Sequence, residues 1–176
     1  MNRVTLGVLL CVGAWVLPSC VKNDADGPPN LRLGRDECVE CGMIINEDRC
    51  SSAMVVNNEG VKEARLFDDI GCMLDYAHEH ADKAEPAGFV HDHGTRGWVK
   101  MDQAWFVLAD EEKLKTPMGS GLVAFAGREE AEKAAAAHGG TVMEYAKLSA
   151  ARRAWMEARY GSPERAPAGG ATGGGK

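Results

Sequence analysis

Along the middle of the chain, the spacing of hydrophobic and polar residues changes twice in the same order, from the alternation of strands to the spacing of a helix and back. Residues 51–58 and 61–67 predict two strands, joined by a hairpin turn at Asn-Asn-Glu-Gly. Residues 69–80 then change to the helical period, which gathers four apolar side chains on one face: Ile70, Met73, Leu74 and Ala77. Asp68 or Asp69 can cap this helix, and residues 88–93 predict a short strand after it.

The second half of the pattern repeats this order. Residues 98–110 and 121–127 predict two strands, residues 128–138 a helix that ends at Gly139-Gly140, and residues 141–146 another strand. Residues 147–160 predict a final amphipathic helix. We therefore expect an α+β fold, in which two ββαβ repeat units form one compact domain with a C-terminal helix.

The N-terminus has the features of an export signal. Arg3 and the free amine precede an apolar stretch, residues 4–17, that is too short for a comfortable transmembrane helix and suits a signal peptide. The following Leu17-Pro18-Ser19-Cys20 looks like a bacterial lipobox, which predicts lipidation of Cys20 and a membrane anchor. An ordinary signal peptide cut nearby, or a short uncleaved anchor, is the alternative. Val21 follows Cys20 in place of the Asp that retains some lipoproteins in the inner membrane, which favours the outer membrane.

Composition divides the chain into four parts. We expect a lipoprotein signal peptide at 1–19, a flexible tether at 20–35 broken by Gly-Pro-Pro, a folded domain at 36–160, and a disordered Gly/Ala/Pro-rich tail at 161–176. The formal net charge is −6, and basic residues are nowhere clustered as nucleic-acid binding would need. The chain is therefore expected to face the periplasm, with no nucleic-acid partner.

Four cysteines remain once Cys11 leaves with the signal and Cys20 is lipidated: Cys38, Cys41, Cys50 and Cys72. A structural zinc site would need two close pairs, but only Cys38 and Cys41 make one. Haem attachment is excluded, because Gly42 stands where the motif needs His. A periplasmic thiol–disulfide oxidoreductase that uses Cys38 and Cys41 is an alternative function. Disulfides, Cys38–Cys41 or Cys50–Cys72, also remain open in an oxidising compartment.

A Cu(I) site is another interpretation of the cysteines, together with nearby methionines, because Cu(I) prefers thiolate and thioether ligands. Cys41 and Met43 flank Gly42, where the backbone can bend tightly so that both side chains converge. Met118 lies in a loop between Pro and Gly residues and is therefore unlike a core methionine. Met54, Met73 and Met143 are expected in the core instead. His91 and His93 alternate on a predicted strand and are further candidate ligands, as is Cys38.

Three segments together resemble the NosL family: Cys41-Gly42-Met43, the stretch Phe67-Asp68-Asp69-Ile70-Gly71-Cys72-Met73, and Pro117-Met118-Gly119-Ser120-Gly121-Leu122 before Ala124-Phe125. With the lipobox they are in the right order and spacing over residues 36–146. The resemblance implies a copper-binding lipoprotein of two ββαβ units, which is not an enzyme. It also implies Cu(I) delivery to the copper cluster of nitrous oxide reductase, with help from that enzyme's maturation transporter complex.

The ligand set that the resemblance implies is Cys41 and Met118, with Met43 added. Cys38 is a departure from the narrowest family pattern. If Cys38 and Cys41 oxidise together, the copper thiolate is lost until a reductant restores it; otherwise Cys38 is itself a ligand. Asp68 and Asp69 are expected to cap a helix rather than to bind metal.

Overall fold

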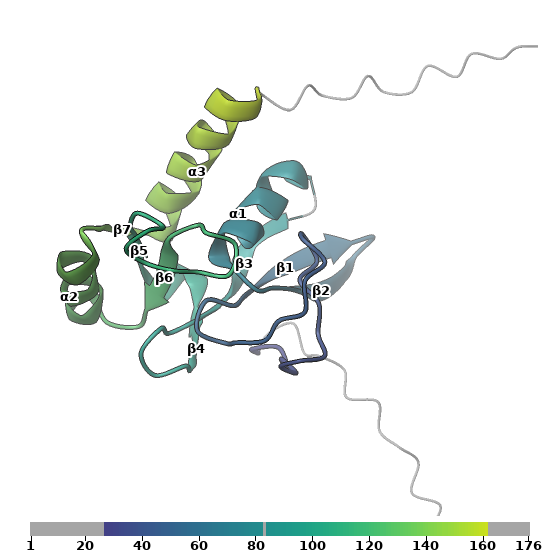
Figure 1. Ribbon diagram of the computed structural model, residues 1–176. Coiled ribbons are helices and arrows are strands. Elements are labelled where there is room, and N and C mark those ends of the chain that lie inside the picture. Colours follow the sequence, from purple (N-terminus) through teal and green to yellow (C-terminus); the bar gives the residue numbers. More distant parts are fainter. Residues whose placement is uncertain (1–26, 83, 162–176) are drawn as a thin grey trace, which may run out of the picture.

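The computed structural model describes residues 27–82 and 84–161 (Figure 1). Cys20 and the tail from residue 162 lie outside the described residues, so lipidation and tail disorder stay predictions. Near the start of the described part, Gly34 donates a backbone hydrogen bond to the carbonyl oxygen of Ile45 at 2.9 Å. Within the described ranges, no helix has both the length and the apolar character needed to cross a bilayer.

Two antiparallel sheets form the framework. The first has the strand order β2-β1-β3-β4, from Ser52–Asn58 (β1), Val61–Phe67 (β2), Ala84–His91 (β3) and Trp98–Lys100 (β4). The second has the order β6-β5-β7, from Trp105–Leu108 (β5), Leu122–Phe125 (β6) and Thr141–Glu144 (β7). In both sheets the first strand of the unit lies between its second and third. The α+β fold and its repeated ββαβ order are therefore confirmed.

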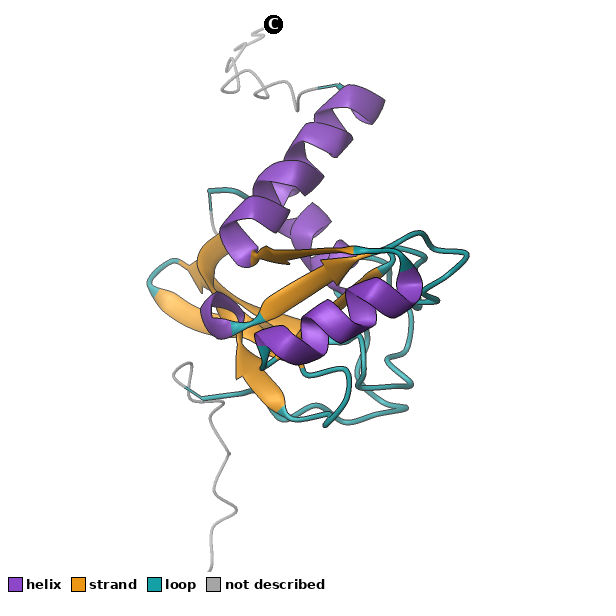
Figure 2. Ribbon diagram, turned by 90° about the vertical axis from the view of Figure 1, so that its left-hand side faces the viewer, coloured by secondary structure: helices purple, strands orange, loops and turns teal. Residues whose placement is uncertain are grey.

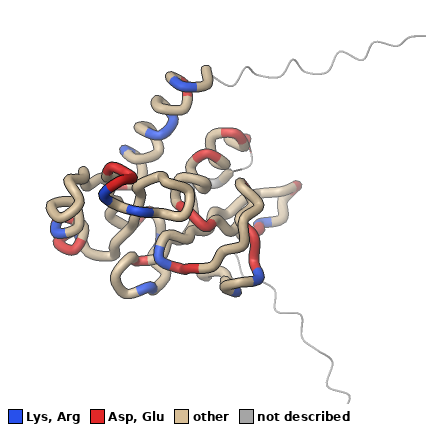
Figure 3. The backbone as a smooth tube through the Cα atoms, in the orientation of Figure 1, with Lys and Arg blue, Asp and Glu red and all other residues tan. Residues whose placement is uncertain are grey.

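Three helices accompany the sheets: Ile70–Glu79 (α1), Arg128–His138 (α2) and Tyr145–Tyr160 (α3), and Figure 2 shows the strands lying among them. The helix α1 packs on the first sheet and beside α3, whereas α2 packs on the second sheet. The predicted C-terminal helix is confirmed, and it begins two residues earlier than expected. Figure 3 shows acidic positions along α1 and basic positions along α3.

One predicted strand proved to be two. The alternating residues 98–110 divide into β4 of the first sheet and β5 of the second, separated by a 3₁₀ turn at Met101–Gln103 (η1). Met101 is fully buried in the shared core, so the chain turns inward there instead of continuing straight. Alternation of apolar side chains cannot reveal this change of sheet, because it continues on both sides of the turn.

The hydrophobic core is shared between the two units. A large cluster joins Met54, Phe67 and Met73 of the first unit to Phe106 and Met143 of the second. Because side chains alternate along a strand, Val107 points to the other face of β5 and packs in a second cluster with α2. The three methionines expected in the core, Met54, Met73 and Met143, are buried there.

Asp92 fastens the two units together just after β3. This buried carboxylate accepts backbone hydrogen bonds from Ala126 at 2.7 Å, Thr95 at 2.7 Å and Gly94 at 3.0 Å. Burial acts to raise the pKa of Asp92, but these donors outweigh it and hold the pKa below its ordinary value. The next residue, His93, also donates its backbone N–H to the carbonyl of Ala124 at 2.8 Å.

Candidate metal centre

A tight turn presents the sulfur atoms near the N-terminus. The backbone N–H of Gly42 donates to the carbonyl of Cys38 at 2.8 Å, and that of Cys38 donates to the carbonyl of Met43 at 2.8 Å. Gly42 has a φ of 74°, the left-handed conformation that glycine adopts without steric cost. The turn buries Cys38, leaves Cys41 half-buried, and exposes 49% of Met43.

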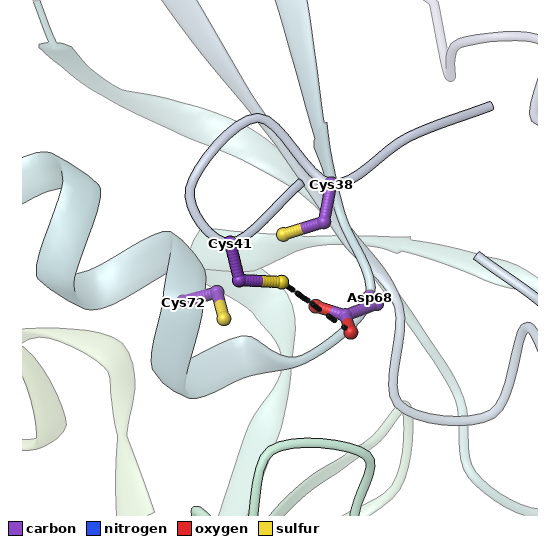
Figure 4. Close-up of side chains that lie close together, drawn as sticks. All are labelled: Cys38, Cys41, Asp68 and Cys72. Carbon is purple, nitrogen blue, oxygen red and sulfur yellow. Dashed lines mark hydrogen bonds between the residues drawn. The ribbon is translucent and has the colours of Figure 1, made fainter. Parts of the chain in front are cut away.

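Four side chains from three segments meet at this turn (Figure 4). One ligand atom from each of Cys38, Cys41, Cys72 and Asp68 lies within 4.8 Å of the others. Asp68 follows β2 directly, and Cys72 stands in the first turn of α1. The Sγ of Cys41 lies 3.6 Å and 3.8 Å from the two carboxylate oxygens of Asp68, close enough for the thiol to donate a weak hydrogen bond.

Asp69 ties the loop of Met118 to the same region. Its Oδ1 accepts the N–H of Gly71 at 2.6 Å and caps α1, as was expected of Asp68 or Asp69. Its Oδ2 accepts the backbone N–H of Met118 at 3.0 Å. The loop also packs closely on α1, because a Cβ built on Gly71 would lie 2.6 Å from the Cβ of Ser120. Two adjacent carboxylates therefore contact Cys41 and Met118 respectively.

The thiols of the cluster share negative charge unequally. A hydrogen bond from Cys72, with backbone donors, lowers the pKa of Cys38 to about 6 although burial acts against this. Burial, and then the neighbouring Cys38, raise the pKa of Cys41 to about 11. The pKa of Cys72 is also raised, first because it donates to Cys38 and then through burial. The cluster therefore holds one thiolate easily, and a bound cation is needed to stabilise more.

The surroundings of the turn are acidic. Burial, with the charges of Glu79 and Asp75, raises the pKa of Glu40 to about 7. Asp75 also forms a bidentate ion pair with Arg152 of α3, with both N–O distances at 2.7 Å. Negative groups around an ion site attract cations and disfavour anions.

The predicted histidine ligands lie apart from the cluster. Among the described residues, the group of four metal-binding side chains contains neither His91 nor His93. The Nδ1 of His91 is 2.7 Å from the hydroxyl oxygen of Ser51, and its ring stacks on Trp98 with centroids 3.6 Å apart. His93 lies against the ring of Phe125, with centroids 5.8 Å apart. Both rings thus have packing roles in the fold.

Cys50 is also separate from the other cysteines. It is buried in the second hydrophobic cluster, with Val107 and Val123, whereas Cys72 belongs to the first cluster. All four described cysteines are free thiols. A Cys50–Cys72 pair is therefore disfavoured by position, whereas any two of Cys38, Cys41 and Cys72 have their sulfur atoms near each other.

Sequence reasoning missed two candidate ligands of the cluster, Asp68 and Cys72. Both belong to the segment Phe67-Asp68-Asp69-Ile70-Gly71-Cys72-Met73, which carries part of the family resemblance. The available signal was the position of a thiol and a carboxylate around a helix N-terminus, where local donors favour anionic ligands. Three soft sulfur donors suit Cu(I), and a fourth oxygen donor also makes the cluster suitable for a tetrahedral divalent ion.

Comparisons with known proteins agree with this chemistry. The sequence pattern that defines the NosL family matches residues 32–152. The chain is 30% identical over 162 residues to the copper-binding lipoprotein NosL of Stutzerimonas stutzeri, covering 86% of this chain and 84% of that protein. Its fold is similar to the crystal structure of the copper chaperone NosL from Shewanella denitrificans, with a TM-score of 0.55 at 19% identity. That similarity covers 68% of this chain and 96% of the other.

Proposed function

The chain belongs to the NosL family, and from this premise we propose that it carries Cu(I) for assembly of the copper centre of nitrous oxide reductase. It is a copper-handling protein and not an enzyme, and copper is its cargo. Its partners are then nitrous oxide reductase and the transporter complex that matures this enzyme. The cluster of soft thiols supports copper as the metal, and the preference of thiolates for the reduced ion supports Cu(I).

In this proposal Cys41 supplies the charged thiolate, while Met118 and Met43 supply neutral thioethers. Two contacts from adjacent residues carry the assignment: Asp68 contacts the Sγ of Cys41, and Asp69 holds the backbone of Met118 at 3.0 Å. Two loops distant in the sequence are thereby held against the same short segment. Cys38 is a further ligand candidate because its sulfur lies in the same cluster.

The exposure of these ligands suits delivery. Met118 is 44% exposed and Met43 is 49% exposed, so a ligand of the partner can approach the metal from solvent. Thioethers are neutral and are displaced more easily than a thiolate. Copper would then leave by stepwise exchange, in which the partner replaces the methionines first and Cys41 last.

A lipid on Cys20 would fix the protein to a membrane, with the folded part in the periplasm. Stable anchoring needs two or more acyl chains, which a bacterial lipoprotein N-terminus provides. The lipoprotein NosL relative supports the anchor, and Val21 is the feature that favours the outer membrane. Metabolic labelling with a clickable fatty acid, compared between the native chain and Cys20→Ser, tests this part of the proposal.

An anaerobic Cu(I) titration against a competing chelator tests the ligand set. We expect one tightly bound Cu(I) in the reduced native chain, loss of binding in Cys41→Ser, and clear weakening in Met118→Leu. Met143→Leu in β7 is the control, since this buried methionine belongs to the hydrophobic core. Transfer of bound copper to copper-free nitrous oxide reductase then tests the partner.

The thiol–disulfide oxidoreductase is the second candidate function. The nearness of the Cys38 and Cys41 sulfurs favours it, because a reversible disulfide requires this. If binding ignores Met118 and needs Cys38 and Cys41 equally, the mixed thiolate–thioether site is refuted. Dithiol chemistry then becomes the better explanation of the turn.

A further inference from the structure

The proposed ligands Cys41, Met43 and Met118 leave Cys72 without a role, and Cys38 only as a further ligand candidate. Only 1% of Cys38 and 6% of Cys72 is exposed, whereas Cys41 is half-buried and stands at the outer side of the cluster. All three sulfurs lie within 4.8 Å of one another, and Figure 4 shows them grouped beside the carboxylate of Asp68.

Packing alone does not account for these two thiols. Cys50 is equally buried in the same protein, and it lies among apolar side chains such as Val107, Val123 and Phe125, as a packing cysteine does. Cys38 and Cys72 also pack in the first hydrophobic cluster, but in addition they have each other, Cys41 and a carboxylate as neighbours. A dithiol held this close together and shielded from solvent is suited to give up two electrons in a reaction within one chain.

We propose that Cys38 and Cys72 reduce Cu(II) to Cu(I), while Cys41 is spared to hold the reduced ion. The inference rests on the proposed copper function, and Cu(II) is the oxidant. Two Cu(II) ions each gain one electron, the two thiols release two protons to solvent, and one Cys38–Cys72 disulfide forms. The reaction occurs once per reduced chain, so it is stoichiometric and does not make the protein an enzyme.

The arrangement of the cluster fits the order of this reaction. Cu(II) accepts oxygen donors better than Cu(I) does, so the half-buried Cys41 sulfur, with the buried Asp68 carboxylate 3.6 Å from it, offers the first contact. The inner thiols then supply the electrons. A disulfide needs a sulfur–sulfur distance of about 2 Å, so the two atoms must approach by about 3 Å at most.

The mobility required for that approach lies on one side of the pair. Cys72 is fixed within α1, whereas Cys38 belongs to a turn that is held by a few backbone hydrogen bonds. After the first electron has left, the neighbouring sulfur shares the unpaired electron in a bond between the two sulfurs. That intermediate gives the second electron to a second Cu(II), which is why two adjacent thiols are needed.

The test adds two equivalents of Cu(II) sulfate to the full-length, reduced protein in a non-ionic detergent without oxygen. A colorimetric Cu(I) chelator measures the product, a thiol reagent counts the free thiols, and peptide mapping by mass spectrometry locates the disulfide. We expect two Cu(I) per chain, loss of two thiols, and a Cys38–Cys72 bond within one chain. Cys72→Ser, Cys72→Ala and Cys38→Ser should each lower the initial rate of Cu(I) formation at least tenfold.

The control is Cys50→Ser, which removes a buried thiol outside the cluster and should leave the rate unchanged. Equal rates in the native chain and in either folded Cys72 variant or Cys38→Ser would overturn the inference, as would a Cys38–Cys41 bond or a bond between chains. Circular dichroism confirms which variants are folded. A chain that binds Cu(I) in the chelator titration but does not reduce Cu(II) refutes only this inference. A native chain that does not bind Cu(I) refutes the copper function itself.

Discussion

Replacing Asp69 tests the link between helix capping and the metal centre. This fully buried carboxylate accepts one hydrogen bond from Gly71 at the start of α1 and another from the backbone of Met118. In Asp69→Asn, the amide oxygen can still accept from Gly71, but the NH₂ group then faces the N–H of Met118. Two donors oppose each other, so the hold on the Met118 loop is lost while the helix cap remains.

The magnitude follows from these two bonds. Losing a hydrogen bond to a charged group costs about 2 kcal/mol, which is the expected loss of stability in Asp69→Asn. Asp69→Ala also loses the cap, worth about 1 kcal/mol, so its expected loss is about 3 kcal/mol. Ordering one freed residue again on copper binding costs about 1–2 kcal/mol. We therefore expect Asp69→Asn to weaken Cu(I) binding about tenfold.

Urea unfolding followed by far-ultraviolet circular dichroism measures the stability, and the chelator titration measures the affinity. Asp102→Asn is the matched control, because this acidic residue is exposed in η1 and its side chain has no place in the metal cluster. If Asp69→Asn matches this control in both urea midpoint and Cu(I) affinity, the carboxylate does not hold the loop. The assignment of Met118 would then lose its main support.

Three further predictions concern the same region and the fold around it. Gly71→Ala should destabilise the protein and weaken Cu(I) binding, because the added Cβ would collide with Ser120. This collision should outweigh the preference of alanine over glycine in a helix, about 1 kcal/mol. Urea unfolding measures the stability, and the chelator titration measures the affinity. Arg152→Met should lower the free energy of unfolding by about 1–3 kcal/mol, because it leaves the half-buried Asp75 unpaired. Adding Asp75→Asn to this variant should recover most of that loss. Burial lowers the pKa of His91, so the unfolded chain binds more protons as the pH falls below 6.5 and stability declines there. His91→Gln should flatten this decline in unfolding measured between pH 7.5 and pH 5, and an unchanged slope would contradict it.

The repeated fold could be predicted because it depends on local periods and turn residues. Alternation, the apolar face of α1 and the stop at Gly139 gave the element order and the two units. The division of residues 98–110 could not be predicted, since it depends on Met101 filling a core that both sheets build. Which sheet a strand joins depends on long-range contacts, and the alternation of side chains along the strand does not indicate it.

The candidate site was predictable where its proposed residues stand in unusual local surroundings. Met118 between Pro117 and Gly119 is plainly a loop residue, and its exposure agrees with that prediction. Cys72 was harder to recognise, because a cysteine in an otherwise apolar helix has the pattern of a core residue. Only the packing of α1 against the N-terminal turn brings its sulfur to Cys38 and Cys41.

The repeated strand order also bears on how such a protein can diverge. The equivalent connection is a short hairpin between β1 and β2 but a long loop, residues 109–121, between β5 and β6. The β5–β6 ladder closes at Leu108 opposite Leu122, directly at the base of this loop. Inserted or deleted residues there would leave the ladder register unchanged. One of the two repeat units can therefore vary its loop, and with it the position of Met118, while the other keeps Cys72 on a constant scaffold.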